Sequence, residues 1–541
     1  MRNAALERRA IPTPSPRPLP WGLLIPSAIT AAVIAAPMVF LIARALGRLP
    51  LTIAVLTAPR TIGLLAATLA LAGAASSLSL ILGAGLAYLV ERTDLPGRRF
   101  WRVALALPLA IPPYLGAIVF LHVFSRGGVL DRAIGVAIPP HGFAGAAAVV
   151  GLYTFPYSFL FTSAALRHAS RTLDEVAQTT GRSSARIFWT VTLPLLRPAV
   201  GAGLFFPSLY ALADFGTMVL LRYDTLGTEL YYQLTAFFDR SAAAAIGLQA
   251  IMLTLGFLWI EARLRGKRRF HPSDASWRPP APRRLAGRKP AAMLAAGGIL
   301  VLTLVVPIAL LAAWAYAGLV HPTDVERLWA SGSGAWAAAI RSLLLAATAA
   351  TVIIALAVPP AYLRVRLIGW PAWAIWAACQ TGYALPGIAV VLAVVSLINS
   401  MAPWLYGTLP VMIGAFMVRY LSAGLRAVDS GLTQLPQRLG EAARGLGQRP
   451  AATFRLIDLP LLRAHLVAGW VLVFLNVLKD LPVSLLLRPP GFDTLPVRTW
   501  LSATDGIYRQ AALPGLLLIA AAALPLVILL HYAAQRGIEV G

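Results

Sequence analysis

Two stretches of this chain repeat one pattern of acidic, small and apolar residues at the same spacing. The first reads Glu175-Val176-Ala177, then Gly181, then Val191-Thr192-Leu193-Pro194. The second lies 266 residues later and reads Glu441-Ala442-Ala443, then Gly447, then Ile457-Asp458-Leu459-Pro460. Five positions separate the glutamate from the glycine in both stretches, and nine separate the glycine from the Val or Ile. The unchanged spacing indicates that the chain is two fused copies of one unit.

The composition indicates that this unit is a membrane domain. Of the 541 residues, 58% are hydrophobic and only 12% are charged, whereas soluble domains are about 25% charged. A membrane-spanning helix needs about 20 apolar residues. Segments of that kind lie at 21–45, 61–90, 101–123, 143–166, 198–221, 241–263, 291–318, 340–363, 370–398, 407–425, 464–487 and 512–534. We therefore expect an all-α polytopic membrane protein with about twelve spans.

Each copy holds six of these segments, an even number, so both copies enter the membrane with the same orientation. The sequence thus predicts two parallel six-helix repeats related by a pseudo-two-fold axis along the membrane normal. The expected organisation is a cytoplasmic tail (1–20), a first span with its outer loop (21–60), the first transmembrane domain (61–263), a basic and Pro-rich cytoplasmic linker (264–290), a seventh span with its outer loop (291–339), and the second transmembrane domain (340–534).

The net charge of +25 could indicate a nucleic-acid partner, so the positions of the basic residues matter. With the amino terminus inside, the cytoplasmic segments hold 33 of the 46 Lys and Arg residues, the outer segments hold 12, and Lys479 lies within a span. This is the positive-inside bias of a plasma-membrane protein. A nucleic-acid partner is excluded, because no basic soluble domain with exposed aromatic residues is present.

The repeated stretches have the features of short helices between spans. Thr172 and Glu175 match a capping box, and Pro436 suits the first turn of a helix in the second copy. Gly181 and Gly447 are suited to end these helices. The small side chains of Ala177, Ala442 and Ala443 allow close approach of another backbone, and the closing prolines, Pro194 and Pro460, begin the next span.

The repeat continues into the fifth span of each copy, where it brings charges into apolar segments. Asp214 in Ala213-Asp214-Phe215-Gly216 aligns with Asp480 in Lys479-Asp480-Leu481-Pro482, again 266 residues apart. A charge at the centre of a span costs about 2.5–3.5 kcal/mol on insertion scales. The charges therefore line a transport pathway, or each aspartate caps a broken helix or pairs with Lys479 only to hold the packing. The sequence leaves both alternatives open.

Proline-rich patches occur in the third span of each copy. They are Pro108-Leu109-Ala110-Ile111-Pro112-Pro113-Tyr114 and Tyr383-Ala384-Leu385-Pro386-Gly387. Proline breaks the hydrogen-bond ladder of a helix, which is tolerated inside a membrane where protein or water satisfies the freed backbone groups. Pro112 and Pro386 are therefore candidate pathway residues with Asp214, Phe215, Lys479 and Asp480, although a simple kink is an equal alternative.

The two stretches resemble the EAA loop of the permeases of binding-protein-dependent ABC importers, whose pattern is EAA, three residues, G, nine residues and I-x-LP. The second copy matches every defined position, and the first has Val176 and Val191 as mild departures. The resemblance implies the type I importer permease fold, with each loop forming a coupling helix seated on an ATPase. The residues that it assigns to coupling are Glu175, Ala177, Gly181, Pro194, Glu441, Ala442, Ala443, Gly447 and Pro460.

The fused layout, with Asp94-Leu95-Pro96-Gly97-Arg98-Arg99 and the fifth-span runs, is similar to the ferric-iron permeases. Permeases for thiamine, polyamine, sulfate and phosphonate share the architecture and remain alternatives. The resemblance implies two copies of a cytoplasmic ATPase and a periplasmic solute-binding protein as partners. It also implies a location in the bacterial inner membrane, with the amino terminus cytoplasmic.

Other classes of function lack their motifs. No G-x-x-x-x-G-K-[S/T] motif for nucleotide phosphates occurs, so ATP hydrolysis is expected of a separate subunit. The seven histidines are scattered and only one cysteine is present, so we expect no metal site, no catalytic residues and no cofactor. The alternative from another class is an ion-coupled secondary transporter with Asp214, Lys479 and Asp480 as a charge relay. The two loops discriminate against it, because a secondary transporter has no ATPase to dock.

Overall fold

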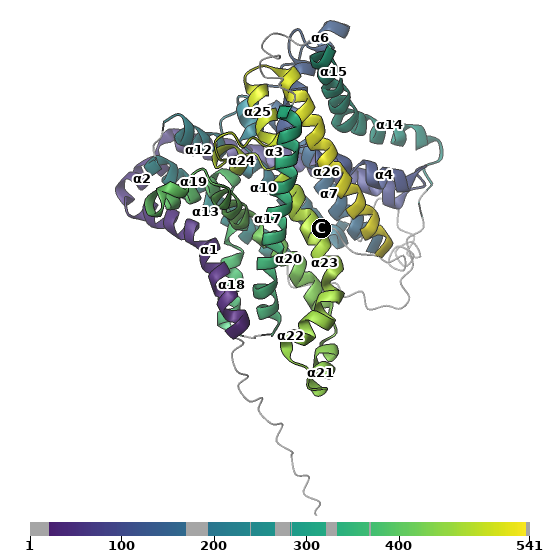
Figure 1. Ribbon diagram of the computed structural model, residues 1–541. Helices are drawn as coiled ribbons and strands as arrows, with labels where there is room; N and C mark the ends of the chain where they lie inside the picture. The colour runs from purple at the N-terminus through teal and green to yellow at the C-terminus, as the bar shows by residue number, and fades with distance from the viewer. Residues whose placement is uncertain are drawn as a thin grey trace, which may run out of the picture.

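The computed structural model describes residues 21–168, 193–237, 240–265, 282, 284–320, 333–366 and 369–536. Within these residues the regular structure is entirely helical, apart from an isolated bridge at Thr93. The long helices α17 (Ser333–Arg366) and α20 (Leu409–Gln434) run between two ends of the molecule, whereas α3 (Pro59–Arg92) crosses it from left to right (Figure 1). One end carries α21 (Gln437–Gly445) and α22 (Pro450–Thr453), and the other carries α6 (Val129–Ile134), α15 (Val306–Val320) and α25 (Leu495–Thr504).

Eleven helices in the described part of the chain are long and apolar enough to cross a membrane, one fewer than the sequence predicts. They cover Trp21–Leu46, Pro59–Arg92, Pro113–Ile134, Gly142–Arg167, Leu196–Ala213, Ser241–Ile260, Ala286–Gly318, Gly334–Val365, Leu409–Gln434, Ala451–Lys479 and Tyr508–His531. The difference lies in the expected span 370–398. It is divided into α18 (Trp370–Cys379), a 3-10 turn η5 (Thr381–Ala384) and α19 (Gly387–Met401).

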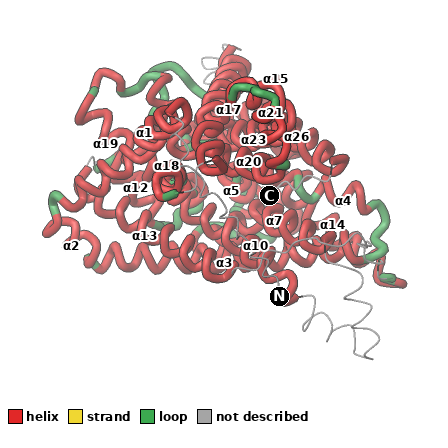
Figure 2. Tube along the Cα trace, turned by 90° about the horizontal axis from the view of Figure 1, so that it is seen from below, coloured by secondary structure: helices red, strands yellow, loops and turns green. Residues whose placement is uncertain are grey.

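Each copy is built around a bundle of three spans. In the first copy these are α3 (Pro59–Arg92), α7 (Gly142–His168) and α10 (Leu193–Ala213), and in the second they are α17 (Ser333–Arg366), α20 (Leu409–Gln434) and α23 (Leu459–Lys479). Seen from below, the two bundles form separate groups, with α21 beside the second (Figure 2). The predicted parallel repeat is therefore present in the fold.

Small residues let the helices of the first bundle approach closely. A Cβ atom on Gly83 of α3 would lie 2.6 Å from the backbone nitrogen of Phe159 in α7, so only glycine fits there. The Ser158 hydroxyl donates to the Gly203 carbonyl of α10 at 2.7 Å and lies 2.9 Å from the Ser79 hydroxyl. Close backbone approach and interhelical hydrogen bonds replace the hydrophobic effect as the force between helices in lipid.

The first span of each copy packs on the other copy. Helix α1 (Trp21–Leu46) lies against α17, α18 and α19 of the second copy. The seventh span, formed by α14 (Lys289–Leu300), a π-helical turn η4 (Val301–Val305) and α15, reaches the first copy. There Ala292 and Ala296 of α14 share a buried cluster with Trp101, and α15 contacts α5 (Pro113–Phe124). This exchange joins the two copies into one body.

Two other spans in each copy are broken at equivalent positions. The third is broken before α5 and before α19, where Pro112 and Pro386 have extended ψ angles of 141° and 145°. The fifth is broken after α10 and after α23, each followed by a five-residue helix, α11 (Gly216–Leu220) or α24 (Pro482–Leu486). The expected continuous spans 198–221 and 464–487 are therefore wrong at their outer ends, and the breaks bring irregular backbone to the middle of the molecule.

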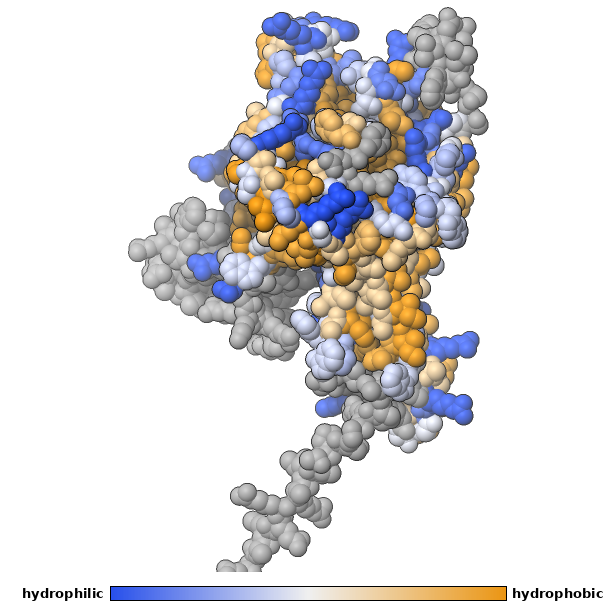
Figure 3. Space-filling model, turned by 90° about the vertical axis from the view of Figure 1, so that its left-hand side faces the viewer, coloured by the Kyte–Doolittle hydropathy of each residue, from blue (hydrophilic) through white to orange (hydrophobic). Residues whose placement is uncertain are grey.

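The remaining helices are short connections and the last span of each copy. They are α2 (Leu49–Thr57), α4 (Arg98–Ala104), η1 (Leu107–Ala110), α12 (Leu226–Thr235), α13 (Arg240–Arg265), η3 (Ala286–Arg288), η6 (Pro403–Leu405), η7 (Phe454–Asp458) and α26 (Tyr508–Arg536). One side view shows hydrophobic residues over much of the spans and hydrophilic residues towards both ends (Figure 3). This distribution suits a protein whose middle faces lipid.

Candidate functional site

The broken spans enclose a cavity of about 140 Å³ between the two copies. Asp214, Phe215, Lys479 and Asp480 line it, and so does Pro112, so five of the six predicted pathway residues lie together. Pro386 is buried but is not among the lining residues. A polar cavity needs about 10–15 Å³ of such volume per water molecule, so this one has room for a small hydrated solute.

The two aspartates cap the short helices that follow them. Asp214 accepts a hydrogen bond from the Thr217 amide at 3.2 Å and another from the Thr217 hydroxyl. Asp480 accepts one from the Val483 amide at 2.9 Å, three residues on as in the first copy. A side-chain oxygen at this position satisfies an amide that has no partner within the helix. The predicted capping role is therefore present in the structure, at residues that also line the cavity.

The partner of Asp480 is a residue that the sequence analysis missed. The Arg419 guanidinium of α20 lies 3.0 Å from an Asp480 carboxylate oxygen, and the Tyr420 hydroxyl donates to the same carboxylate at 2.6 Å. The Arg419 side chain is only 16% exposed and that of Asp480 is fully buried. Of the basic residues we expected only Lys479 within a span, but Arg419 also lies inside the expected span 407–425, and α20 continues past it to Gln434. No sequence signal marks it beyond a single arginine near the end of an apolar segment.

Lys479 does not pair with an aspartate, as the packing alternative had supposed. Its ammonium donates to the carbonyl of Leu109 at 2.8 Å, in the broken third span of the first copy. That carbonyl belongs to the 3-10 turn η1, which precedes the extended residues Ile111 and Pro112. The contact joins the end of α23 in one copy to the proline break in the other.

The first copy supplies phenol groups where the second supplies Arg419 and Lys479. Tyr114 and Tyr153 line the cavity, and their hydroxyls are buried without a hydrogen-bond partner within the described residues. Buried polar groups in native proteins are nearly always paired. Asp214 takes part in no ion pair within the described chain. The cavity therefore offers oxygen atoms on one side and cationic groups on the other, which a polar solute or water can satisfy.

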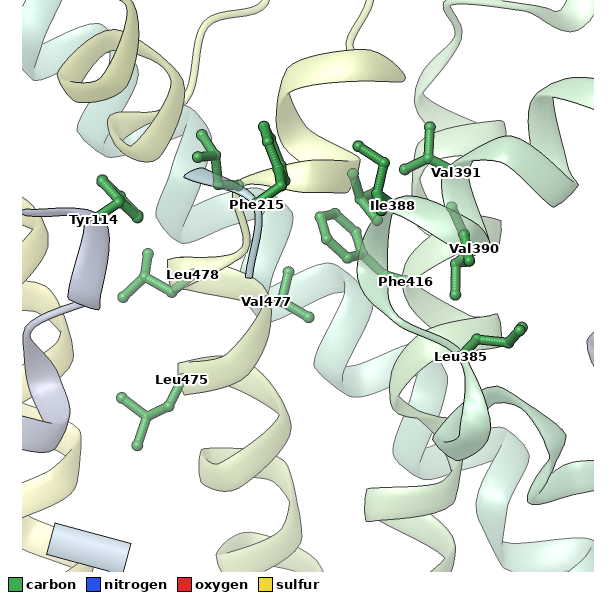
Figure 4. Close-up of a cluster of buried hydrophobic side chains, with 14 of the residues drawn as sticks. Tyr114, Phe215, Leu385, Ile388, Val390, Val391, Phe416, Leu475, Val477 and Leu478 are labelled. Carbon is green, nitrogen blue, oxygen red and sulfur yellow. The ribbon is translucent and has the colours of Figure 1, made fainter. Parts of the chain in front are cut away.

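Aromatic side chains join the copies beside the cavity. The ring of Trp500 in α25 lies 6.0 Å from that of Phe215 and 5.9 Å from that of Tyr231 in α12. Figure 4 shows Phe215 near the end of α23, with Leu475 and Leu478 on one side of that helix and Val477 on the other. The pathway residues thus rest in an apolar, closely packed interface.

Helix α21 of the second repeated stretch has the end that the sequence predicts. Gly447 has a φ of +75°, the left-handed conformation, and the amide of Gln448 donates to the Ala443 carbonyl at 3.0 Å. This hydrogen bond across six residues is the Schellman motif that follows many helices. A Cβ on Gly447 would meet nothing within 4 Å, so its conformation rather than lack of space requires glycine.

The side chains of α21 divide between a packed face and an open one. Ala443 is buried, whereas Ala442 and Gly447 are exposed, so the two alanines do not share the single small face that we expected. Leu446 is 82% exposed at the tip. Pro460 lies inside a continuous helix, Ala451–Lys479, so the span begins earlier than the Leu-Pro pair. The Glu441 side chain lies outside what the structure describes.

The first repeated stretch cannot be compared in the same way. Glu175, Ala177 and Gly181 lie outside the described residues, and so does the predicted capping box at Thr172. Pro194 is the second residue of α10, so here the Leu-Pro pair does stand at the first described turn of the span. The coupling roles of these residues stay predictions.

Fold and cavity together define a transport protein made of two parallel membrane repeats with a polar site between them. The chain belongs to the family described as binding-protein-dependent transport system inner membrane component, which matches it twice, at residues 79–270 and 353–539. It is thus a multi-pass inner-membrane permease of the ABC importer class, and its relatives are permease subunits rather than enzymes.

Its similar proteins include both fused and single-copy permeases. The Fe(3+)-transport system permease protein FbpB 2 of Haemophilus influenzae is 27% identical over 521 residues, which are 96% of this chain and 99% of the relative. The ferric transport system permease protein FbpB of Actinobacillus pleuropneumoniae is 24% identical over 80% of this chain and 66% of its own. The molybdenum transport system permease protein ModB of Mycobacterium tuberculosis is 29% identical over 44% of this chain and 92% of its own, the length of one copy.

Proposed function

We propose that this chain forms the pathway of an ATP-driven importer in which separate ATPase subunits bind α21 and its counterpart in the first copy. The observation that carries the proposal is the position of α21, a short helix at one end of the molecule with an exposed apolar tip at Leu446. Leu439, near the other end of α21, is exposed as well, so this short helix presents apolar side chains that a partner protein would cover. In this arrangement α21, the linker and the amino terminus are cytoplasmic, and a periplasmic binding protein meets the opposite end.

A continuous helix connects the coupling helix to the cavity. From Ala451 to Lys479 the helix is unbroken, with one π-helical turn at Phe454–Asp458. A helix of this length spans roughly 40 Å at 1.5 Å per residue. Movement of α21 by the ATPases would therefore displace Lys479 and Asp480 directly. Closure of the ATPases would draw the two loops together and rock the two copies about the cavity.

The proposed solute is ferric iron. It is supported by the likeness to a ferric permease along nearly the whole of both chains. The cavity agrees with it, because carboxylate and phenol oxygens suit a hard cation, and Asp214, Tyr114 and Tyr153 supply them. Relatives named for molybdenum and sulfate match about one copy each. We expect the chain itself to bind no cofactor and to leave ATP hydrolysis to its partner.

The test is uptake by vesicles that contain the permease with its ATPase and receive its binding protein from outside. ATP enclosed in the vesicles should drive uptake of radioactive ferric iron, and excess molybdate or sulfate should not compete. Omission of the ATPase is the control, and it should abolish uptake. Uptake that continues without ATP would refute the importer class, whereas ATP-driven uptake of molybdate in place of iron would refute only the solute.

A further inference from the structure

Helices α12 and α25 occupy equivalent positions in the two copies. The first amide of α12, on Leu226, donates to the Thr68 hydroxyl of α3 at 3.0 Å. The first amide of α25, on Leu495, donates to the Ser342 hydroxyl of α17 at 2.8 Å. An equivalent hydrogen bond thus joins the start of each helix to the second span of its own copy, α3 or α17. Residues of α12 and α25 therefore correspond at an offset of 269.

These helices meet on the pseudo-two-fold axis. Tyr231 corresponds to Trp500 at this offset, and their rings lie 5.9 Å apart in an edge-on contact. A residue that touches its own symmetry mate must lie at the axis itself. Trp500 is buried and its ring also contacts Phe215, a cavity-lining residue. The surfaces that flank this contact border the place where a solute must enter.

The charge at one pair of equivalent positions is reversed. In the first copy Glu229 is buried and pairs with Arg60 at 2.9 Å. In the second copy the residue corresponding to Glu229 is Arg498. Thr68 and Ser342 are 274 residues apart, and at this offset Gly334 replaces Arg60. A Cβ on Gly334 would lie only 2.0 Å from the Arg498 guanidinium, so that side chain fills the space left by the missing arginine. At these two positions, an acidic residue with a basic partner in the first copy is replaced by a single basic residue in the second.

Further cations gather around Arg498. Arg488 pairs with Asp493, and Arg498 lies 3.6 Å from the same carboxylate. Arg341 donates to the Gly491 carbonyl at 2.8 Å and lies over the Phe492 ring. We name Arg341, Arg488 and Arg498 the arginine cluster. Two of its cations, Arg488 and Arg498, share the Asp493 carboxylate, and they keep 27% and 28% of their side-chain surface exposed.

The two copies differ in net charge around these positions. Burial lowers the pKa of Arg498 below its ordinary value, and the neighbouring charge of Arg341 lowers this pKa further. In the first copy the equivalent positions are Ala67, Arg222 and Glu229, with Asp224 and Arg60 beside them. These formal charges cancel, whereas those of the second copy leave two positive charges. We call the end of the pathway formed by α12 and α25 the rim. The rim therefore carries more positive charge on the second copy than on the first.

We propose that the arginine cluster is the docking site for an acidic surface on the solute-binding protein, and that it fixes the one orientation in which that protein sits across the two copies. This inference rests on the proposed function, because it places α12 and α25 at the periplasmic end. Charged groups arranged in this way steer encounter and exclude the wrong orientation more than they add raw affinity. A symmetric rim would accept the partner equally well after a half-turn.

A protein partner fits the location better than anionic lipid does. The cluster lies at the start of α25, two residues before Trp500, and α25 packs against α5 of the other copy as well as α26. Because they are two positions apart on a helix, Arg498 and Trp500 project to opposite sides of α25, and Arg498 points towards Gly334 at the start of α17. The cluster therefore lies beside the axial contact, where a partner that spans both copies would cover it. Arginine presents several donors in a planar fork that matches carboxylates and phosphates alike, so the position beside the axis, rather than the chemistry of the cluster, favours a protein partner. Glutamate and aspartate side chains on the partner are its natural complement.

The experiment measures binding of the purified solute-binding protein of the same transport system to the full permease–ATPase complex in nanodiscs of phosphatidylcholine. Wild type is compared with Arg498→Gln, with Arg488→Gln and with the double variant. Arg222→Gln is the matched control, because Arg222 is the exposed equivalent of Arg488 in the first copy. Association rates are recorded at several salt concentrations, since rim charges act mainly on these rates.

We expect the double variant to bind about tenfold more weakly, with slower association and a shallower dependence on salt, and the Arg222→Gln control to stay within about twofold of wild type. An equal loss of binding affinity in the control and in the double variant would refute the role of the cluster in orienting the partner. Unchanged binding by the double variant would refute it as well. If addition of phosphatidylglycerol to the nanodiscs abolishes the difference, the cluster binds lipid instead. Absence of binding by wild type would contradict the proposed function itself.

Discussion

Asp214 and Asp480 occupy equivalent positions, yet their neutral replacements should differ sharply in stability. Asn in place of Asp480 keeps an oxygen for the Val483 amide but removes the charge that faces Arg419 at 3.0 Å. Asn in place of Asp214 also keeps an acceptor for the Thr217 amide, and it leaves no cation without a partner. One change breaks a buried ion pair and the other alters only a helix cap.

The expected difference follows from burial. Because Arg419 is 16% exposed and the Asp480 side chain is inaccessible, removal of the carboxylate leaves a cation in a medium of low dielectric constant. Such a break costs about 3–5 kcal/mol, whereas replacing a hydrogen bond to a charged group by a neutral one costs about 1 kcal/mol. Asp480→Asn should therefore shift the folding equilibrium roughly a hundredfold further than Asp214→Asn, at 1.4 kcal/mol per tenfold. Asp214→Asn should reach the membrane at normal levels and lose uptake if Asp214 meets the solute.

The assay is denaturant unfolding of the purified protein in detergent micelles for wild type and both variants. The combination of Asp480→Leu with Arg419→Met removes both charges, and it should cost less than Asp480→Asn alone because no charge is left buried and unpaired. Equal destabilisation by Asp214→Asn and Asp480→Asn would refute the assignment of Arg419 as the partner of Asp480. Unimpaired uptake by Asp214→Asn would refute a pathway role for that residue.

Three further predictions concern the loops. Gly447→Ala should destabilise the end of α21 by about 1–2 kcal/mol, because this residue has a left-handed backbone conformation. The substitution should also reduce binding-protein-stimulated ATP hydrolysis. Gly445→Ala, within the helix, is the control and should leave ATP hydrolysis unchanged. The pKa of Asp94 is lowered chiefly by its hydrogen bond from Lys289, so its contact with the Leu285 amide should hold above the ordinary pKa of 3.8 and be lost as pH falls through the lowered value. Hydrogen exchange at Leu285 measures this, and Asp94→Ala should remove the protection at every pH. A reporter fused after Gly447 should behave as cytoplasmic and one after Asp505 as periplasmic; the reverse would overturn the six-plus-six topology.

Much of this architecture is readable from sequence because it rests on local patterns. Apolar length predicts the spans, and equal spacing predicts the repeat. The left-handed Gly447 also follows from its position after a short helix. The aspartate caps could be stated only as one of two alternatives. The structure shows that capping and cavity lining occur at the same residues.

What sequence reasoning missed depends on contacts between distant segments. Arg419 is one charge in α20, and its role appears only when α23 brings Asp480 to it. Lys479 was paired with its neighbour in the chain, but the broken third span of the other copy offers a free carbonyl at Leu109. The expected span 370–398 is wrong for a different reason, since the break at Pro386 divides an apolar run that composition alone indicates to be continuous. The Arg419 contact forms within the second copy, the Lys479 contact forms between the copies, and the third difference is a local break in the backbone.

Contact between α21 and an ATPase is the central feature of the proposed importer. A cysteine at Leu446, exposed at the tip of α21, in a variant whose native Cys379 is replaced by serine, should form a cross-link to the ATPase subunit in membranes, and ATP should change its yield. A chain that imports its solute with ATP but shows no cross-link from this position, under conditions where a control cysteine pair within the ATPase reacts, would contradict the coupling assignment.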